Sequence, residues 1–454
     1  MKIQIPADVA WILGKMRSAG FEAYAVGGCV RDALLGKEPN DWDITTSAKP
    51  EETKRIFPKT IDTGIQHGTV TVMKNHVGYE ITTYRIDGTY ADGRHPDSVE
   101  FTSDLKEDLR RRDFTINAMA YSEETGIVDE FGGMDDLKNH VIRCVGNAME
   151  RFTEDALRIL RAVRFSAQLG FEIEEETWNA LSVIAPNLKN VSAERIQVEL
   201  TKTLLSAHPE NLLMVKETGM ESYISKTFAR VFEVSEENSG HSGEINRESI
   251  DGLRARLSRA ASLPQEKAVR WAALLAHLDE KTAVTILREM KLDNDTIKSV
   301  KTLVGHFDDP FSRITDVKPG EPVEAGEPEE TEEPEEPEEP ANEKLREAEY
   351  EARLLMSQIS PELLDRLLLL IHTLSPEREK TVDSVKKVVD RIRERGDCIS
   401  LKTMAVTGQD LIRSGIKPGP ELGRILAEMF ERVLRDPDCN EKETLMAELP
   451  GNRE

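Results

Sequence analysis

Two acidic residues near the start of the chain have the spacing of a metal-binding pair. Asp41 and Asp43 flank a tryptophan in Trp42–Thr45, a stretch with strand character. Residues i and i+2 of a strand point to the same face, so the two carboxylates would converge. Converging carboxylates repel each other unless a cation lies between them, and Mg²⁺ held by carboxylates and substrate phosphates is usual in phosphoryl transfer. An exposed turn at Asn40 is the alternative interpretation.

A glycine-rich turn precedes this pair. The sequence Val26-Gly27-Gly28-Cys29-Val30-Arg31-Asp32 follows a predicted strand and opens a predicted helix. Glycines let the backbone approach a phosphate closely, and helix N–H groups together with Arg31 supply donors and positive charge. We therefore expect Gly28 and Arg31 to contact a phosphate. The alternative is a strand–turn–helix whose glycines serve packing alone.

A third candidate is the acid–base pair in Glu154-Asp155-Ala156-Leu157-Arg158. In a predicted helix over Phe152–Leu169, Asp155 and Arg158 are three residues apart and therefore neighbours on one face. A carboxylate accepts from the exocyclic amine of cytosine or adenine, whereas guanine and uracil present a carbonyl oxygen there. Arg158 can donate to the adjacent ring acceptors. Such a pair can in principle select C and A over G and U without a nucleic-acid template, and the family resemblance described below implies that role for it.

These residues need an α/β scaffold followed by helices. A helix is predicted over Ala7–Ala19, and strands over Ala23–Val26, Gly68–Met73 and Tyr79–Tyr84, whereas the pattern from about Glu150 onward is helical almost throughout. We expect an α+β protein in which a small N-terminal α/β head with a mixed sheet precedes a long all-helical neck, body and tail. The predicted boundaries are 1–145 for the head, 146–210 for the neck with base recognition, 211–315 for the body, 316–342 for an acidic insert, and 343–454 for the remaining body and the tail.

Charge and composition exclude other classes of protein. The 454 residues carry a net charge of −24, and eleven glutamates without any lysine or arginine lie between Glu321 and Glu339. This Pro/Glu-rich run cannot form a packed core, so it is predicted to be a disordered linker. Bulk charge therefore does not indicate a nucleic-acid partner. The sequence has no apolar run of membrane-spanning length and no signal peptide, and its four scattered cysteines fit a reduced, cytoplasmic protein.

The motifs together resemble a known family. GGCVRD followed by DWDITTS is similar to the head of DNA polymerase β-type nucleotidyltransferases, and more narrowly to the bacterial class II tRNA nucleotidyltransferases, the CCA-adding enzymes. Three further segments match: Arg110–Ala120 resembles the family's RRDFTxNA motif, Asp87–Pro96 its flexible loop, and Glu154–Arg158 its EDxxR motif. The similarity runs from about Ala25 to Leu205 and returns near Ala405–Leu434.

The resemblance implies template-independent addition of CCA to the 3′ end of tRNA from CTP and ATP. Asp41 and Asp43 would hold two Mg²⁺ ions while the tRNA 3′-hydroxyl attacks the α-phosphate and pyrophosphate leaves. Glu80 on a neighbouring strand could be a third acidic group, to which we do not commit. The resemblance also implies nucleotide contacts for a set of basic and acidic side chains: Arg112 near the triphosphate, Asp155 and Arg158 at the base, and Arg161 and Arg164 at the nucleotide or its phosphates.

Alternatives remain for several of these basic residues. For Arg112 the alternative is a solvated charge in a run of three arginines, and for Arg161 and Arg164 it is an ion pair with a neighbouring acid. Each helical step of three residues drifts back by about 60°, which favours Arg161 over Arg164 on the face of Asp155. The basic stretch Lys386, Lys387, Arg391, Arg393 and Arg395 either touches RNA or forms a solvated helix face.

Two helical segments bear on competing functions. Arg270–Asp279 resembles the metal-binding helix of an HD phosphohydrolase, but Leu278 separates His277 from Asp279, so we expect a supporting helical body instead. Ala405–Leu411 and Lys417–Gly423 resemble the tail of full-length CCA-adding enzymes, and turns there could contact tRNA phosphates.

Full CCA addition is the leading hypothesis. Enzymes that add only CC or only A come next, and a poly(A) polymerase is third; the retained loop Asp87–Pro96 and the tail favour the first. The retained carboxylates disfavour an inactive RNA-binding protein, and the long helical body disfavours a small-molecule nucleotidyltransferase. The oligomeric state is left open by the sequence.

Overall fold

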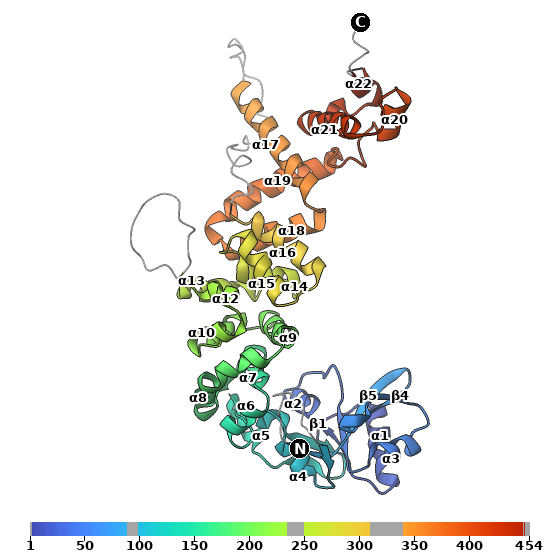
Figure 1. Ribbon diagram of the computed structural model, residues 1–454, viewed down its shortest axis with the longest axis vertical. Coiled ribbons are helices and arrows are strands. Elements are labelled where there is room, and N and C mark those ends of the chain that lie inside the picture. Colours follow the sequence, from blue (N-terminus) through green and yellow to red (C-terminus); the bar gives the residue numbers. More distant parts are fainter. Residues whose placement is uncertain (1, 89–98, 234–248, 309–338, 448, 450–454) are drawn as a thin grey trace, which may run out of the picture. The chain divides into compact units, whose positions relative to one another are not determined.

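The computed structural model describes residues 2–88, 99–233, 249–308, 339–447 and 449 (Figure 1). Most of the predicted loop Asp87–Pro96 and of the predicted insert 316–342 therefore lies outside the described residues. The described chain divides into two compact units: Met1–Ala261 with Thr285–Asp293, and Ser262–Val284 with Asn294–Glu454. All residues predicted to bind metal or nucleotide lie in the first unit.

A seven-stranded sheet forms the centre of the head. Its strand order is β3 (Thr60–Gly64), β4 (Thr69–Lys74), β5 (Val77–Thr83), β2 (Ile44–Thr46), β1 (Ala23–Val26), β8 (Met119–Ser122) and β9 (Gly126–Asp129). Strands β2 and β5 run parallel and the other neighbours run antiparallel, which confirms the predicted mixed sheet. The three residues of β2 are all buried, as expected for a central strand.

The first carboxylate motif lies at the entrance to β2. The predicted strand Trp42–Thr45 was placed too early, because β2 begins at Ile44. Asp43 nevertheless takes part in the pairing with β1, since its carbonyl accepts a hydrogen bond from Val26 N at 3.0 Å. The alternation of exposed Asp41, buried Trp42 and exposed Asp43 is the period-two pattern that the sequence argument required.

Helices and a small ribbon complete the head. Helix α1 (Ala7–Ser18) buries Val9, Ile12, Leu13 and Met16, the spacing of an amphipathic helix, and packs on β1. The remaining head elements are α2 (Gly28–Leu34), α3 (Pro50–Ile56), the ribbon of β6 (Arg85–Asp87) and β7 (Val99–Phe101), α4 (Leu105–Arg110), α5 (Gly133–Asn139) and β10 (Val141–Ile142).

The predicted helix Phe152–Leu169 is two helices. Helix α6 (Ala148–Glu154) ends, Asp155 has extended backbone with φ −144° and ψ 102°, and α7 (Leu157–Leu169) begins. The Asp155 carboxylate accepts a hydrogen bond from Leu157 N at 3.1 Å. A short acidic side chain that satisfies a free helix N–H competes with continued helix, which explains the break.

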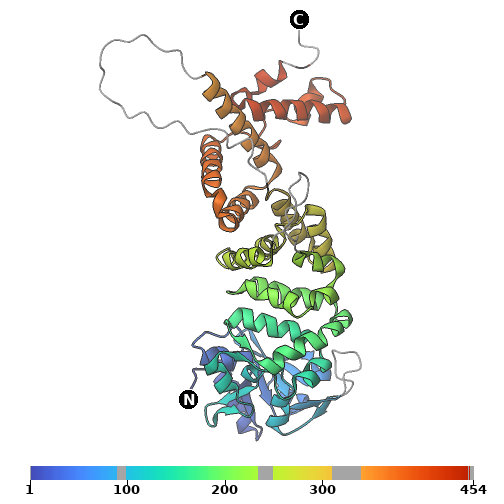
Figure 2. The same ribbon diagram turned by 90° about the vertical axis from the view of Figure 1, so that its left-hand side faces the viewer.

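The rest of the first unit is almost wholly helical, as predicted. Helices α7 and α9 (Ala193–Leu204) lie side by side (Figures 1 and 2). The other elements are β11 (Glu172–Ile173), which pairs with β10, and the helices α8 (Glu175–Ile184), α10 (Met214–Glu217), α11 (Glu221–Ile224), α12 (Lys226–Ala229) and α13 (Ile250–Ala260).

The second unit is built from helices in its described residues. Ile359 and Ser360 separate α17 (Glu339–Gln358) from α18 (Pro361–Leu374), and the last residues assigned to the acidic insert are helical. The other helices are α14 (Lys267–Leu275), α15 (Glu280–Glu289, which ends in the first unit), α16 (Asn294–Gly305), α19 (Glu379–Arg395), α20 (Gly408–Arg413), α21 (Pro420–Arg435) and α22 (Lys442–Met446). Among the described residues, no helix is both long and apolar enough to cross a membrane.

Candidate active site

The acidic residues gather at the start of β2 and on its neighbour β5. Ile44 pairs with Ile81, so Glu80 on β5 lies level with Asp43. The side chain of Asp43 reaches the surface, but the surrounding protein removes water from part of it, which raises its pKa; the negative charges of Asp41 and Glu80 raise the pKa further, while Arg112 opposes them. Mutual repulsion of this kind favours a bound cation. No group of three or more metal-ligating side chains is preformed in the described part of the chain.

The glycine turn between β1 and α2 places an arginine beside these carboxylates. Gly27 has φ +84°, and a Cβ built on it would lie 2.9 Å from Nη1 of Arg112. At Gly28 a Cβ would meet Arg31 at an ordinary 3.6 Å. We predicted a phosphate contact for Gly28, and this stays a prediction; the glycine at which a side chain is disfavoured by both its positive φ and its close neighbour is Gly27. Its neighbour across the turn is 85 residues away in the sequence, and no local signal distinguishes the two glycines.

We expect Gly27→Ala to be far more harmful than Gly36→Ala. Both glycines have positive φ, +84° and +71°, but a Cβ at Gly36 meets nothing within 4 Å. Gly36→Ala should cost about 1 kcal/mol of unfolding free energy from the backbone alone. Gly27→Ala should cost roughly 3 kcal/mol, because the displaced Arg112 adds to the backbone strain. Urea denaturation of both variants checks this, and equal losses would contradict the close approach of Arg112.

The three consecutive arginines have different partners. Arg110 is paired with Glu107 at 3.3 Å, and Arg111 with the buried Asp108 at 2.9 Å. Arg112 lies 3.6 Å from Asp108 and is the one that acts electrostatically on Asp43. The structure therefore brings Arg112 to the carboxylates.

Arg31 connects α2 to the segment that follows the arginines. It is 9% exposed, and its guanidinium donates to Asp32 at 2.8 Å and to the Asn117 side chain at 2.6 Å. Asn117 in turn donates to Asp113 at 3.1 Å. Two predicted motifs, the glycine turn and the arginine segment, are thus joined by hydrogen bonds between buried polar groups.

Asp155 and Arg158 are not neighbours on one helix face, which corrects the sequence argument. Asp155 precedes α7, and its carboxylate accepts a hydrogen bond from Arg195 at 2.7 Å. Arg158 donates to Glu154 at 2.7 Å and to the carbonyl of Arg111 at 3.2 Å. The sequence could have suggested Glu154 as the partner of Arg158, because residues four apart on a helix are neighbours. Arg195, on α9, carried no signal in the sequence.

Arg161 and Arg164 are both paired with acids in this structure. Arg161 Nε donates to Asp113 at 2.7 Å, and Arg164 forms an ion pair with Glu199 at 2.8 Å. Their side chains are 32% and 8% exposed, so Arg161 is the more accessible of the two. Burial lowers the pKa of Arg164 to about 10, and the like charges of Arg161 and Arg31 contribute.

We expect Asp113 to make the stability of the head fall at acid pH. Burial alone would raise the pKa of Asp113, but Arg161 and a hydrogen bond from Asn117 outweigh it and hold the pKa well below its usual range. A depressed pKa stabilises the fold above the unfolded value of about 4 and loses that contribution as the pH falls through the folded value. Asp113→Asn should cost roughly 3 kcal/mol at pH 7 and flatten the acid side of the stability profile. An unchanged profile between pH 6 and 3 in urea titrations would refute this.

Two segments singled out in the sequence lie in the second unit. His277 and Asp279 follow α14 instead of lying on it, and Asp279 caps α15 by accepting from Thr282 N at 2.9 Å. In the basic stretch of α19, Arg393 is paired with Asp365 at 2.9 Å and Arg395 with Glu349 at 2.8 Å.

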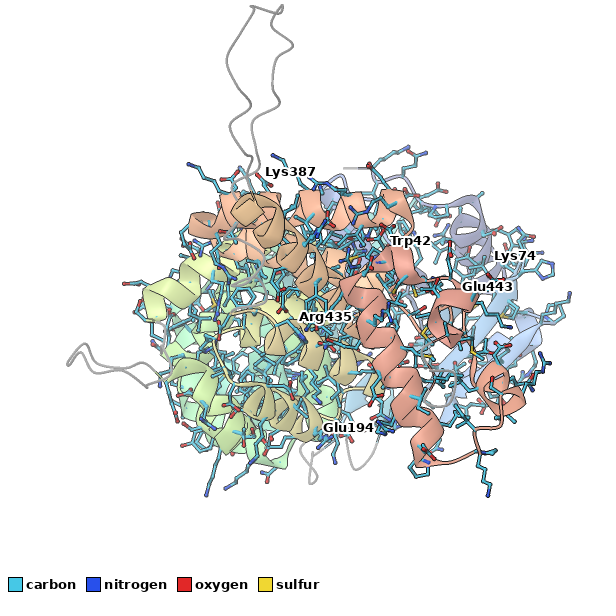
Figure 3. The ribbon with its side chains drawn as sticks, turned by 90° about the horizontal axis from the view of Figure 1, so that it is seen from above. Trp42, Lys74, Glu194, Lys387, Arg435 and Glu443 are labelled. Atoms are coloured by element: carbon cyan, nitrogen blue, oxygen red, sulfur yellow. The ribbon has the colours of Figure 1, made fainter. Side chains whose placement is uncertain are left out.

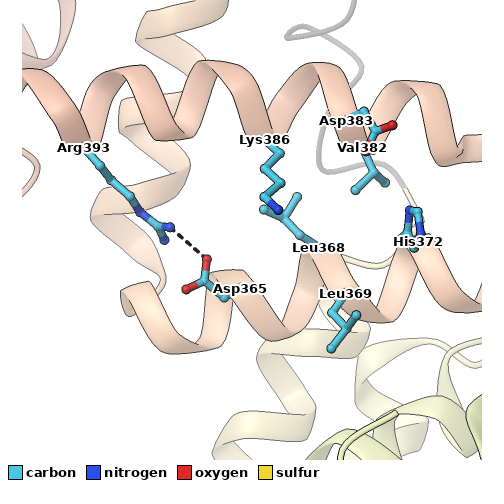
Figure 4. Close-up of a pocket in the computed structure, with 8 residues that line it drawn as sticks. All are labelled: Asp365, Leu368, Leu369, His372, Val382, Asp383, Lys386 and Arg393. Carbon is cyan, nitrogen blue, oxygen red and sulfur yellow. Dashed lines mark ion pairs between the residues drawn. The ribbon is translucent and has the colours of Figure 1, made fainter. Parts of the chain in front are cut away.

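Two lysines of the basic stretch remain at the surface. Lys387 is exposed and points outward (Figure 3). Lys386 lines a groove of about 500 Å³ between α18 and α19, whose other labelled side chains include Leu368, Leu369 and the Arg393–Asp365 pair (Figure 4). The arginines of this stretch are thus largely committed to ion pairs, and the lysines are the groups open to a partner.

Comparison with known families matches three parts of the chain. The family described as "Poly A polymerase head domain" matches residues 23–143. "Probable RNA and SrmB- binding site of polymerase A" matches residues 170–230, and a tRNA nucleotidyltransferase domain 2 family matches residues 361–449.

Full-length relatives cover nearly the whole chain. A CCA-adding enzyme of Leuconostoc mesenteroides is 37% identical over 97% of this chain and 98% of its own. One from Ligilactobacillus salivarius is 56% identical over 44% of this chain and 49% of its own. The crystal structure of the Bacillus stearothermophilus CCA-adding enzyme in complex with CTP superposes with a TM-score of 0.67 and 30% identity, covering 96% of each chain.

Proposed function

Because this chain belongs to the family of CCA-adding enzymes, we propose that it adds C, C and A to the 3′ end of tRNA from CTP and ATP, without a template. The 3′-hydroxyl of the tRNA attacks the α-phosphate of the nucleotide, and pyrophosphate leaves. The observation that carries this proposal is the position of Arg112, which lies against Gly27 and acts on Asp43. It joins the glycine turn, the arginine segment and the carboxylate pair in one place.

The carboxylates fit a divalent cation, as membership of this family implies. Asp41 and Asp43 share one face, and the repulsion that raises the pKa of Asp43 would be relieved by a bound cation. We assign Mg²⁺ to these two side chains, since it takes one or two carboxylates and completes its shell with water and phosphate oxygens. When bound, it would neutralise phosphate charge and lower the pKa of the attacking hydroxyl.

The basic side chains receive the nucleotide. Arg31 and Arg112 flank the glycine turn and supply positive charge for the triphosphate, and Gly28 lets the backbone approach it. Arg161 and Arg164 add to this charge from α7. Such donors act by binding the phosphates and fixing them in place.

Base selection is assigned to Asp155 and Arg158. The Asp155 carboxylate already accepts from Leu157 N and from Arg195, and it retains lone pairs for an exocyclic amine. Glu154 and the Arg111 carbonyl hold Arg158, which leaves other N–H groups of its five to donate to a ring acceptor. CTP as a ligand is supported by the Bacillus stearothermophilus relative.

The partner and the compartment complete this proposal. We propose that tRNA is held in part by the second unit, whose residues 361–449 match a tRNA nucleotidyltransferase domain. Lys386 and Lys387 on α19 are candidates for backbone phosphate contacts. Cys29, Cys144, Cys398 and Cys439 are buried free thiols, which fits a reducing compartment such as the cytoplasm.

A primer-extension assay tests the function. Three tRNA transcripts, ending before CCA, after C and after CC, are each offered CTP, ATP or both with Mg²⁺. Addition of CCA followed by a halt is expected. Two C residues without A would indicate a CC-adding enzyme, A on the third transcript alone an A-adding enzyme, and a lengthening A tail a poly(A) polymerase. Binding of tRNA without incorporation would indicate an inactive RNA-binding protein.

A further inference from the structure

A single buried aromatic ring lies beneath three of the arginines assigned to the nucleotide. The guanidinium carbons of Arg31, Arg161 and Arg164 lie 5.1, 5.3 and 4.1 Å from the ring centroid of Phe165. Phe165 is only 5% exposed. Because Arg31 comes from α2 of the head and the other two come from α7, the ring is shared by parts of the chain far apart in the sequence.

Three like charges around one ring repel each other, and that repulsion needs to be balanced. Carboxylates balance it on the outer side of each arginine: Asp32 for Arg31, Asp113 for Arg161 and Glu199 for Arg164. Glu199 also lies 3.9 Å from Arg161, whereas Asp32 and Asp113 are paired with one arginine of the three each, so none of these acids holds all three guanidinium groups. On the inner side, the electron-rich face of the phenyl ring is the group that attracts all three.

The ring is itself held in place. Phe114, which is fully buried, packs against it edge-to-face at 5.7 Å with an interplanar angle of 80°. Phe114 directly follows Asp113, the partner of Arg161. A ring locked in this way presents a fixed surface to the cations, and cation–π attraction is strongest where water is excluded.

We propose that Phe165 is a positioning residue for the nucleotide triphosphate. Its ring holds the guanidinium groups of Arg31, Arg161 and Arg164 close together, so that the N–H donors not used by their carboxylates are gathered where the phosphates bind. The ring does not touch reacting atoms. This inference rests on the proposed function in its choice of ligand, CTP or ATP.

Stepwise fluorination of the ring tests the proposal. Position 165 of the full chain carries phenylalanine or one of three analogues with one, two or three ring fluorines: 4-fluoro-, 3,5-difluoro- or 3,4,5-trifluorophenylalanine. Fluorine withdraws electron density from the ring face and changes the shape of the ring little. The KM for CTP should rise at each step, reaching about tenfold in the trifluoro protein, because each weakened cation–π contact loosens the cluster. The kcat should change less than about twofold, since the lost binding is common to ground and transition states.

The same series at Phe228 is the matched control. Phe228 is fully buried and packs edge-to-face on Phe232, and in the described part of the chain no cation–π contact involves it. Its fluorination should leave the KM for CTP unchanged. A KM that does not depend on fluorination at Phe165, or that rises equally at Phe228, would overturn the proposal and leave Phe165 a packing residue.

Calorimetry separates this proposal from the proposed function. The Kd of CTP, measured without tRNA in the same series, should rise in parallel with KM. If the Kd of CTP rises with each fluorine but the protein never extends tRNA, the proposed reaction is rejected and the role of Phe165 stands. If the Kd of CTP is the same in all the fluorinated proteins and tRNA is extended, only the role of Phe165 is rejected.

Discussion

Asp43→Ala is expected to lower the rate of C addition by about a thousandfold or more while the fold remains intact. The substitution removes one of the two carboxylates assigned to the cation, and such an ion supplies several kcal/mol of transition-state stabilisation. Asp43 lies at the surface of the site, so no core packing is lost. The measurement is single-turnover incorporation from CTP on a tRNA lacking CCA, together with thermal unfolding of the variant.

The matched control is Asp135→Ala, at an exposed aspartate in the first turn of α5. It should retain wild-type activity and stability. Removal of divalent ions with EDTA should abolish incorporation by the wild type, and added Mg²⁺ should restore it. Substantial turnover by Asp43→Ala, at rates within about tenfold of the wild type, would remove the metal assignment of this pair.

Asp155→Asn is expected to relax base selection. An amide donates as well as accepts, so it can pair with the carbonyl oxygen that uracil and guanine present where cytosine and adenine carry an amine. A well-formed pair of hydrogen bonds discriminates by about 1–3 kcal/mol, so the preference for CTP over UTP should fall roughly 10- to 100-fold. The helix break should survive, because the oxygen of the introduced amide can still accept from Leu157 N.

The measurement compares kcat/KM for CTP and UTP in the same primer-extension assay. Asp135→Asn, the same chemical change at an exposed site, should leave the preference intact. The Asp155→Asn variant also weakens the contact with Arg195, so a general loss of activity is expected alongside the altered preference. A general loss without any change in the CTP-to-UTP ratio would contradict a role in reading the base.

Local spacing was enough to predict the carboxylate pair. Asp41 and Asp43 alternate with the buried Trp42, and this period-two pattern does not depend on the residue at which β2 begins. Strands over Ala23–Val26, Gly68–Met73 and Tyr79–Tyr84 were likewise predicted from short β-branched or alternating runs. Both follow from interactions between residues close in the chain, which sequence patterns record directly.

Helix periodicity gave a wrong prediction at Asp155, where a side chain competes for a backbone hydrogen bond. A continuous helix over Phe152–Leu169 would place Asp155 and Arg158 on one face, but Asp155 caps the second helix and ends the first. The capping tendency of aspartate was visible in the sequence, yet the surrounding apolar pattern favoured an unbroken helix. The partner that fixes Asp155, Arg195, is 40 residues away.

By itself, the sequence determined the type of scaffold, the motifs and the family, because residue type, spacing and period are written in the order of the chain. Only the tertiary structure decided which arginine meets the carboxylates, which glycine lies closest to it, and that one phenyl ring lies under three guanidinium groups. The physical reason is distance along the chain. Ion pairs, close approaches and cation–π contacts between Arg31, Arg112 and α7 depend on how separate elements pack, and no local pattern encodes that packing.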